Sequence, residues 1–158
     1  MIVDVVIEIP RGSQNKYEVD HETGRIRLDR VLFSPMHYPA EYGLIENTLS
    51  EDGDPLDALV LTSFPTFPGC IVRARIVGLL EMSDDKGVDN KLLGVAADDP
   101  RFDGIQSLDD VNPHILKEIP HFFQTYKQLE NKEVEIRGWK GTEEALKVLE
   151  ASRQRYQG

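Results

Sequence analysis

Hydrophobic and polar residues alternate through much of the first hundred positions, which is the pattern of β-strands that bury one face. Segments rich in β-branched and other apolar residues predict strands over residues 2–9, 16–19, 25–32, 56–61, 71–80 and 92–96. The segment from Ser34 to Gly43 contains two prolines, a glycine and several aromatic residues, so it is predicted to be an ordered loop. The first two thirds of the chain are therefore expected to form a sheet.

The spacing of apolar residues becomes helical after position 112. Asn112 can cap a short helix, Pro120 starts or kinks a second helical segment, and apolar residues between 115 and 129 keep to one helical face. Residues 132–137 predict a last strand, and Thr142 caps a C-terminal helix. Many short strands before two or three helices, without βαβ alternation, predict an α+β protein. Its mostly antiparallel sheet is expected to close, or nearly close, into a small barrel with the helices outside.

The length and charge of the chain narrow its class. Its 158 residues are the length of one domain, which we expect to span residues 1–158. Cys70 is the only cysteine, so no internal disulfide forms, and no basic leader or membrane-spanning apolar run is present. We expect a cytoplasmic protein with no membrane partner. With 28 acidic and 18 basic residues, the net charge of −10 argues against a nucleic-acid-binding surface.

The stretch Glu51-Asp52-Gly53-Asp54-Pro55-Leu56-Asp57 places four carboxylates in seven residues. An acidic surface turn is the simpler interpretation, because Asp and Gly are common in turns. The sequence that follows favours another, because Leu56 and residues 58–61 form a buried strand that carries Asp57 into apolar surroundings. A buried carboxylate is costly unless it is paired or metal-bound, so Asp57 needs a cation.

Acidic residues also stand beside two other predicted strands. Glu8 ends the first strand, and a second acidic turn with Asp84, Asp85 and Asp89 leads into the strand at residues 92–96. If these acids meet the stretch at residues 51–57 at one mouth of the barrel, two or more divalent cations are the natural compensation for their repulsion.

Basic residues stand on polar faces or just past an acid, where they would rim such a site: Lys16, Arg30, Lys91 and Lys127. Metal ions with lysine and arginine beside them suit a polyanionic substrate, most simply a phosphate compound.

Other metal and nucleotide motifs do not fit. In an EF-hand that starts at Asp52, the fifth, sixth and twelfth positions would be Leu56, Asp57 and Ser63, which are the wrong residues. Walker A, Rossmann glycine and His-Glu-x-x-His patterns are absent. The histidines are scattered, so we do not expect them to form a zinc site: His21, His37, His114 and His121.

The hexapeptide at residues 52–57 resembles the signature of the family I soluble inorganic pyrophosphatases. Further matches occur in family order and at about family spacing, up to Trp139: Glu8-Ile9-Pro10, Lys16-Tyr17-Glu18, Asp29-Arg30, Tyr38-Pro39-x-x-Tyr42-Gly43, Asp84 through Lys91, and His121-Phe122-Phe123-x-x-Tyr126-Lys127. The run around His21 is similar to an actinobacterial branch of the family.

This resemblance implies a five-stranded, OB-like barrel with extra strands and flanking helices, which hydrolyses pyrophosphate to two orthophosphates with Mg²⁺. It implies direct in-line attack by a metal-activated water, several Mg²⁺ ions per site with Mn²⁺ or Zn²⁺ as substitutes, and a homohexamer. The implied metal ligands are Glu8, Asp52, Asp57, Asp84 and Asp89. The implied phosphate-binding residues are Lys16, Arg30, Tyr42, Lys91, Tyr126 and Lys127.

The same resemblance implies a proton acceptor and supporting residues. Asp54 is the first candidate for the general base, and Asp89 is the second. Tyr38 and Asp85 would support the site, and Glu18 would orient Lys16.

Two alternatives to a pyrophosphatase remain. The chain could hydrolyse another phosphoanhydride, such as a nucleotide or polyphosphate, although no purine-binding motif is present. From a different class, it could bind divalent cations without catalysis.

Overall fold

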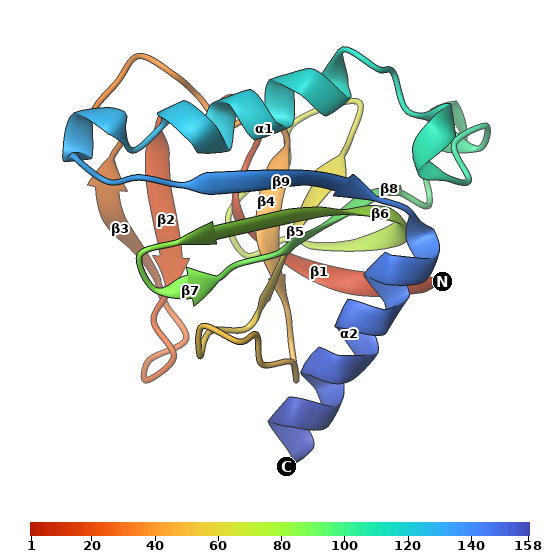
Figure 1. Ribbon diagram of the computed structural model, residues 1–158, viewed down its shortest axis with the longest axis horizontal. Coiled ribbons are helices and arrows are strands. Elements are labelled where there is room, and N and C mark those ends of the chain that lie inside the picture. The colour runs from red at the N-terminus through yellow and green to blue at the C-terminus, as the bar shows by residue number, and fades with distance from the viewer.

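The computed structural model describes residues 1–158, and five of its strands are hydrogen-bonded in a closed ring. Figure 1 shows these strands with the helices around them. Neighbouring strands in the ring pair antiparallel except β5 and β8, which are parallel, and the pairing of β6 with β1 closes the ring. In ring order the strands are β1 (Ile2–Ile9), β4 (Glu41–Ile45), β5 (Leu56–Leu61), β8 (Lys91–Ala96) and β6 (Ile71–Asp84). The predicted α+β class and small, mostly antiparallel closed sheet are confirmed.

The remaining elements flank this ring. A separate hairpin of β2 and β3 lies at one side, α1 crosses above the ring, and α2 descends from the opposite side (Figure 1). β7 and β9 both pair with β6. The bounds are β2 (Asn15–Val19), β3 (Ile26–Val31), β7 (Gly87–Val88), β9 (Glu135–Lys140), α1 (Ile115–Thr125) and α2 (Thr142–Gln157), with 3₁₀ turns η1 (Pro100–Phe102), η2 (Leu108–Asp110) and η3 (Gln128–Glu130).

The core consists of two apolar clusters, and β5 contributes to both. Its residues Leu59 and Leu61 belong to the cluster that contains the phenylalanines of α1. Leu56, Ala58 and Val60 belong to the cluster that contains the buried face of α2. Because both faces of β5 are covered, the strand is a continuous apolar run, interrupted only by Asp57.

The prediction of a loop over residues 34–43 is wrong for residues 41–43, which belong to β4. The strand pairs with β1 on one side and β5 on the other, and all five of its residues are buried. Gly43 is required there, because a Cβ atom would lie 2.0 Å from the carbonyl oxygen of Val6. Gly43 therefore allows two strands to approach closely.

The helical region also differs from the expectation. A single helix, α1, replaces the two predicted segments and contains Pro120. Proline has no N–H for the carbonyl of Leu116, four residues earlier, but the indole Nε1 of Trp139 donates to that oxygen at 2.7 Å. A side chain from β9 thus replaces the missing helical bond. Leu129, which the sequence places on the apolar helical face, lies beyond the end of α1 and is exposed.

The helix caps are shifted as well. His114 takes the N-cap position of α1 that was predicted for Asn112, whose Oδ1 instead accepts the backbone N–H of His114. At α2 the N-cap is Gly141, and the hydroxyl of Thr142 donates to the carbonyl of Val77. The tertiary contact with β6 therefore sets where α2 begins.

Candidate active site

The acidic loop between β4 and β5 is pinned at both of its ends. The buried hydroxyl of Thr48 donates to the carbonyl of Ile45 at 2.5 Å and accepts the N–H of Leu56 at 2.9 Å. Further along, the backbone of Leu49 bonds to α2: its N–H donates to the carbonyl of Ser152, and its carbonyl accepts from Arg155. The loop that carries Asp52 and Asp54 is thus anchored on the ring and on α2.

Asp57 lies at the centre of the site, paired with a buried lysine. The parallel pairing of β5 with β8 sets Asp57 beside Lys91, whose side chain is only 2% exposed. The Lys91 ammonium lies 3.0 Å from Asp57 Oδ2, 2.9 Å from Asp89 Oδ2 and 2.7 Å from the hydroxyl of Tyr42. Tyr42 donates in turn to Asp57 Oδ2 at 2.5 Å. Burial opposes the charge on Lys91, but the two carboxylates outweigh burial and raise its pKa.

Two carboxylates near Asp57, those of Glu8 and Asp52, have raised pKa values. Burial raises the pKa of Glu8 to about 7, and the charge of Asp57 adds to this, although Val19 donates a backbone N–H to Glu8 at 2.9 Å. Burial raises the pKa of Asp52 to about 6, with additional repulsion from Asp89. The acids of three separate segments therefore lie close enough to repel one another.

A cavity of about 110 Å³ opens beside these carboxylates. Acidic and basic side chains both line it, and the exposed side chain of Asp54 makes no hydrogen bond within the protein. The charged and titratable residues of its lining are Glu8, Lys16, Tyr17, Glu18, His21, Tyr42, Asp54 and Asp57.

Asp84 lies with the remaining predicted phosphate-binding residues. Its carboxylate is 3.8 Å from the ammonium of Lys127, and burial lowers the pKa of that lysine. The ring of Tyr126 stacks on Phe122, and burial raises the pKa of the Tyr126 hydroxyl. Arg30, on β3, donates to Asp29 at 2.6 Å, and its charge lies close enough to lower the pKa values of Tyr126 and Lys127.

The residues predicted to support the site have different surroundings. Tyr38 is buried against the rings of Tyr42, Phe122 and Tyr126. Glu18 does not hold Lys16, because the partner of Lys16 is Asp29, at 3.4 Å. Lys16 and Glu18 lie on the same face of β2, but the β2–β3 hairpin places Asp29 of β3 next to Lys16.

Asp85 lies in the exposed turn between β6 and β7 and makes no hydrogen bond through its side chain. Two residues near the site were not singled out from the sequence, Thr48 and Glu130. The only local sign that Glu130 lies near the site is its position three residues after Lys127, on the same turn.

The carboxylates have donor chemistry that suits hard divalent cations. In Glu8, Asp52, Asp57 and Asp89, one oxygen accepts hydrogen bonds from the protein and the other accepts none. No three His, Cys, Asp or Glu side chains already converge around one point, and Lys91 occupies the position between Asp57 and Asp89. The donor set therefore suits divalent cations, with the ammonium of Lys91 between two of the carboxylates.

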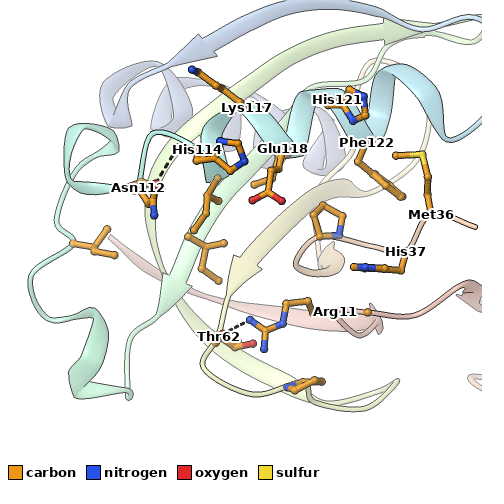
Figure 2. A pocket seen from close by; sticks show the side chains of 18 of the residues that line it. Arg11, Met36, His37, Thr62, Asn112, His114, Lys117, Glu118, His121 and Phe122 are labelled. Carbon is orange, nitrogen blue, oxygen red and sulfur yellow. Dashed lines mark hydrogen bonds between the residues drawn. The ribbon is translucent and has the colours of Figure 1, made fainter.

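A larger cavity, about 990 Å³, lies elsewhere, beneath α1. Figure 2 shows His114, Glu118 and Phe122 of this helical segment on one side and Arg11 and Thr62 on the other. None of the predicted metal-binding or phosphate-binding residues lines it. Of the predicted metal-binding, phosphate-binding and base residues, the small cavity of about 110 Å³ is lined by Glu8, Lys16, Tyr42, Asp54 and Asp57. Asp84 lies outside that lining, beside Lys127.

A small closed barrel whose carboxylates, lysines and arginine lie close enough to shift one another's pKa values suits a hydrolase that acts on an anionic substrate. The family model for inorganic pyrophosphatase matches residues 5–157. The chain belongs to the inorganic pyrophosphatase family.

Relatives and solved structures agree over nearly the whole chain. The inorganic pyrophosphatase of Geobacillus stearothermophilus is 56% identical over 155 residues, which are 98% of this chain and 94% of the relative. The one from Leifsonia xyli subsp. xyli is also 56% identical, over 94% of this chain and 91% of the relative, so identity does not single out one bacterial branch. The crystal structure of inorganic pyrophosphatase from Thermus thermophilus superposes with a TM-score of 0.96 at 51% identity, covering 99% of this chain and 92% of that one.

Proposed function

We propose that this chain hydrolyses inorganic pyrophosphate to two orthophosphates and requires Mg²⁺. The observation that carries the proposal is the buried ammonium of Lys91 between Asp57 and Asp89. Glu8 and Asp52 lie close enough for the charge of Asp57 to add to the rise that burial causes in their pKa values. Such a cleft favours cations over neutral ligands, and its basic rim favours phosphate oxygens. Pyrophosphate complexed with Mg²⁺ satisfies both preferences.

The proposed metal ligands are Glu8, Asp52, Asp57, Asp84 and Asp89. Bound Mg²⁺ would supply positive charge at the phosphates and lower the pKa of a water molecule. Mn²⁺ and Zn²⁺ are the proposed substitutes, since they accept the same oxygen donors.

The chain's own residues then orient the substrate and take up the proton. Lys16, Arg30, Tyr126 and Lys127 bind phosphate oxygens, together with Tyr42 and with Lys91, whose donors are shared with Asp57 and Asp89 in this structure. Asp54 accepts the proton of the attacking water, because its carboxylate lines the cleft without a protein hydrogen bond. Asp89 is the second candidate. Water attacks the phosphorus in line, so no covalent enzyme intermediate forms.

Phosphate release from pyrophosphate by the purified protein tests the proposal. We expect turnover with Mg²⁺ and none after chelation, and no release at any metal concentration would contradict it. Comparing pyrophosphate with a nucleoside triphosphate and polyphosphate tests the alternative phosphoanhydride substrates.

Two substitutions separate metal binding from proton transfer. Asp57→Asn should weaken metal binding and turnover together, whereas Asp54→Asn should lose turnover by about a hundredfold or more while Mg²⁺ still binds. Calorimetric titration with Mg²⁺ measures the binding. Equal loss of metal binding in both variants refutes this division of roles, and turnover unchanged by Asp54→Asn leaves Asp89 as the base.

We also propose a cytoplasmic homohexamer built from single-domain chains. Large apolar side chains that remain exposed on the single chain, among them Phe64, Phe67 and Ile71, support burial in an assembly. Sedimentation equilibrium should report six chains, and a monomer at micromolar concentration contradicts the assembly. No helix of the structure has the length and apolarity needed to cross a membrane.

A further inference from the structure

Glu130 is a buried carboxylate that the proposed mechanism does not use. It ends the 3₁₀ turn η3, and its side chain is 7% exposed. Its Oε1 lies 3.0 Å from Nε of Arg30, and its Oε2 is buried without a hydrogen-bond partner. Arg30 is the only cation paired with this carboxylate, which is costly to bury unless it is paired.

The backbone of Glu130 is held firmly. Its N–H donates to the carbonyl of Lys127 at 3.0 Å, and Lys132 donates to the same oxygen at 3.2 Å. Asn131 then ends the turn in the left-handed region, with φ of 59°. The turn that fixes Glu130 begins directly after Tyr126 and Lys127, so all three side chains originate from one rigid segment.

The guanidinium of Arg30 is held from two directions. Nη1 donates to Asp29 on the same strand, and Nε faces Glu130, one hundred residues away in sequence. Nη2 has no protein partner and is therefore the atom left for a ligand. The contact with Glu130 is an ion pair by distance, since the direction of the Nε–H is outside the range of a hydrogen bond.

We propose that Glu130 is a positioning residue for the substrate, which acts by fixing the Arg30 guanidinium. The inference rests on the proposed function, in which Arg30 binds a phosphate group. Glu130 ties the β2–β3 hairpin to the turn after α1, so it sets the spacing between Arg30 on one side of the cleft and Tyr126 and Lys127 on the other. A guanidinium already held in place loses little rotamer freedom when the substrate binds.

The test is a double-mutant cycle on kcat and KM for pyrophosphate at saturating Mg²⁺. Glu130→Ala should raise KM about two- to tenfold with kcat changed less, because an unfixed arginine must be ordered by the substrate. Glu130→Gln should recover part of this loss, because its amide oxygen can still face Nε of Arg30. Glu133→Ala, at an exposed position on the same segment, is the matched control and should leave both constants unchanged.

The cycle is completed in the Arg30→Ala background, where removing Glu130 should raise KM no further. Equal effects of the Glu130 change in both backgrounds overturn the inference, and so does an unchanged KM in Glu130→Ala. If Glu130→Ala does not fold, the cycle is run with Glu130→Gln against the same control. Absence of turnover by the unmodified protein overturns the proposed function and this inference with it, whereas turnover with additive effects overturns this inference alone.

Discussion

Replacing Glu8 with glutamine should stabilise the metal-free protein at alkaline pH. Glu8 is partly buried at the end of β1, beside Asp57, and one of its oxygens accepts the backbone N–H of Val19. Glutamine keeps an oxygen for that N–H and removes the titrating charge. The substitution therefore mimics a permanently protonated Glu8.

The size of the effect follows from the raised pKa. Glu8 has a pKa of about 7 in the folded chain, against 4.5 for an unperturbed glutamate. Below pH 4.5 the group is protonated in both states and costs nothing. Between the two values the unfolded chain releases the proton while the folded chain retains it, so the free energy of unfolding falls as pH rises. A pKa difference of one corresponds to about 1.4 kcal/mol, so the cost approaches about 3 kcal/mol above pH 7.

Urea unfolding of both proteins at one protein concentration, with a chelator, measures this cost. At pH 5 their free energies of unfolding should agree within about 1 kcal/mol, and at pH 8 the Glu8→Gln protein should be more stable by about 3 kcal/mol. Excess Mg²⁺ should reduce this advantage, because cations relieve the carboxylate repulsion and stabilise the unmodified protein. A stability difference that is the same at pH 5 and pH 8 would show that Glu8 is not the titrating group.

Three further substitutions test the packing of the site. Lys91→Met should lower the metal-free free energy of unfolding by about 3–5 kcal/mol in urea, because Asp57 and Asp89 lose their buried cation; unchanged stability would mean that the pair is not needed. Thr48→Val should cost about 2–3 kcal/mol in the same assay, because a buried N–H and carbonyl lose their partner, and a cost under 0.5 kcal/mol contradicts this. Tyr126→Phe should fold with an unchanged melting temperature and a raised KM for pyrophosphate; a protein that unfolds instead would show that the hydroxyl serves the core.

The strands that carry the site were predictable from local pattern. Alternation located β1, β2 and β3, and the continuous apolar run located β5, because side-chain period and burial are properties of neighbouring residues. The same run showed that Asp57 would be carried into apolar surroundings. The structure confirms this placement and supplies the cation as Lys91 on the parallel neighbour, β8.

Prediction from local sequence was wrong at two positions where a residue far away in the chain changes what the local backbone can do. Pro120 looked like a helix boundary because it lacks an N–H, but Trp139 bonds to the carbonyl that would be left free. Gly43 looked like a loop residue, but the close approach of β1 makes it a strand residue. In both cases a tertiary contact reversed a correct local preference.

The sequence by itself determined the strand pattern, the acidic hexapeptide and the candidate ligands, since these depend on residue type and spacing. Only the tertiary structure decided how the charges combine. Closing the ring pairs Lys91 with Asp57, anchoring the acidic loop on α2 holds Asp52 in place, and folding the turn after α1 brings Glu130 to Arg30. Burial and proximity set these interactions, and both depend on residues far apart in the chain.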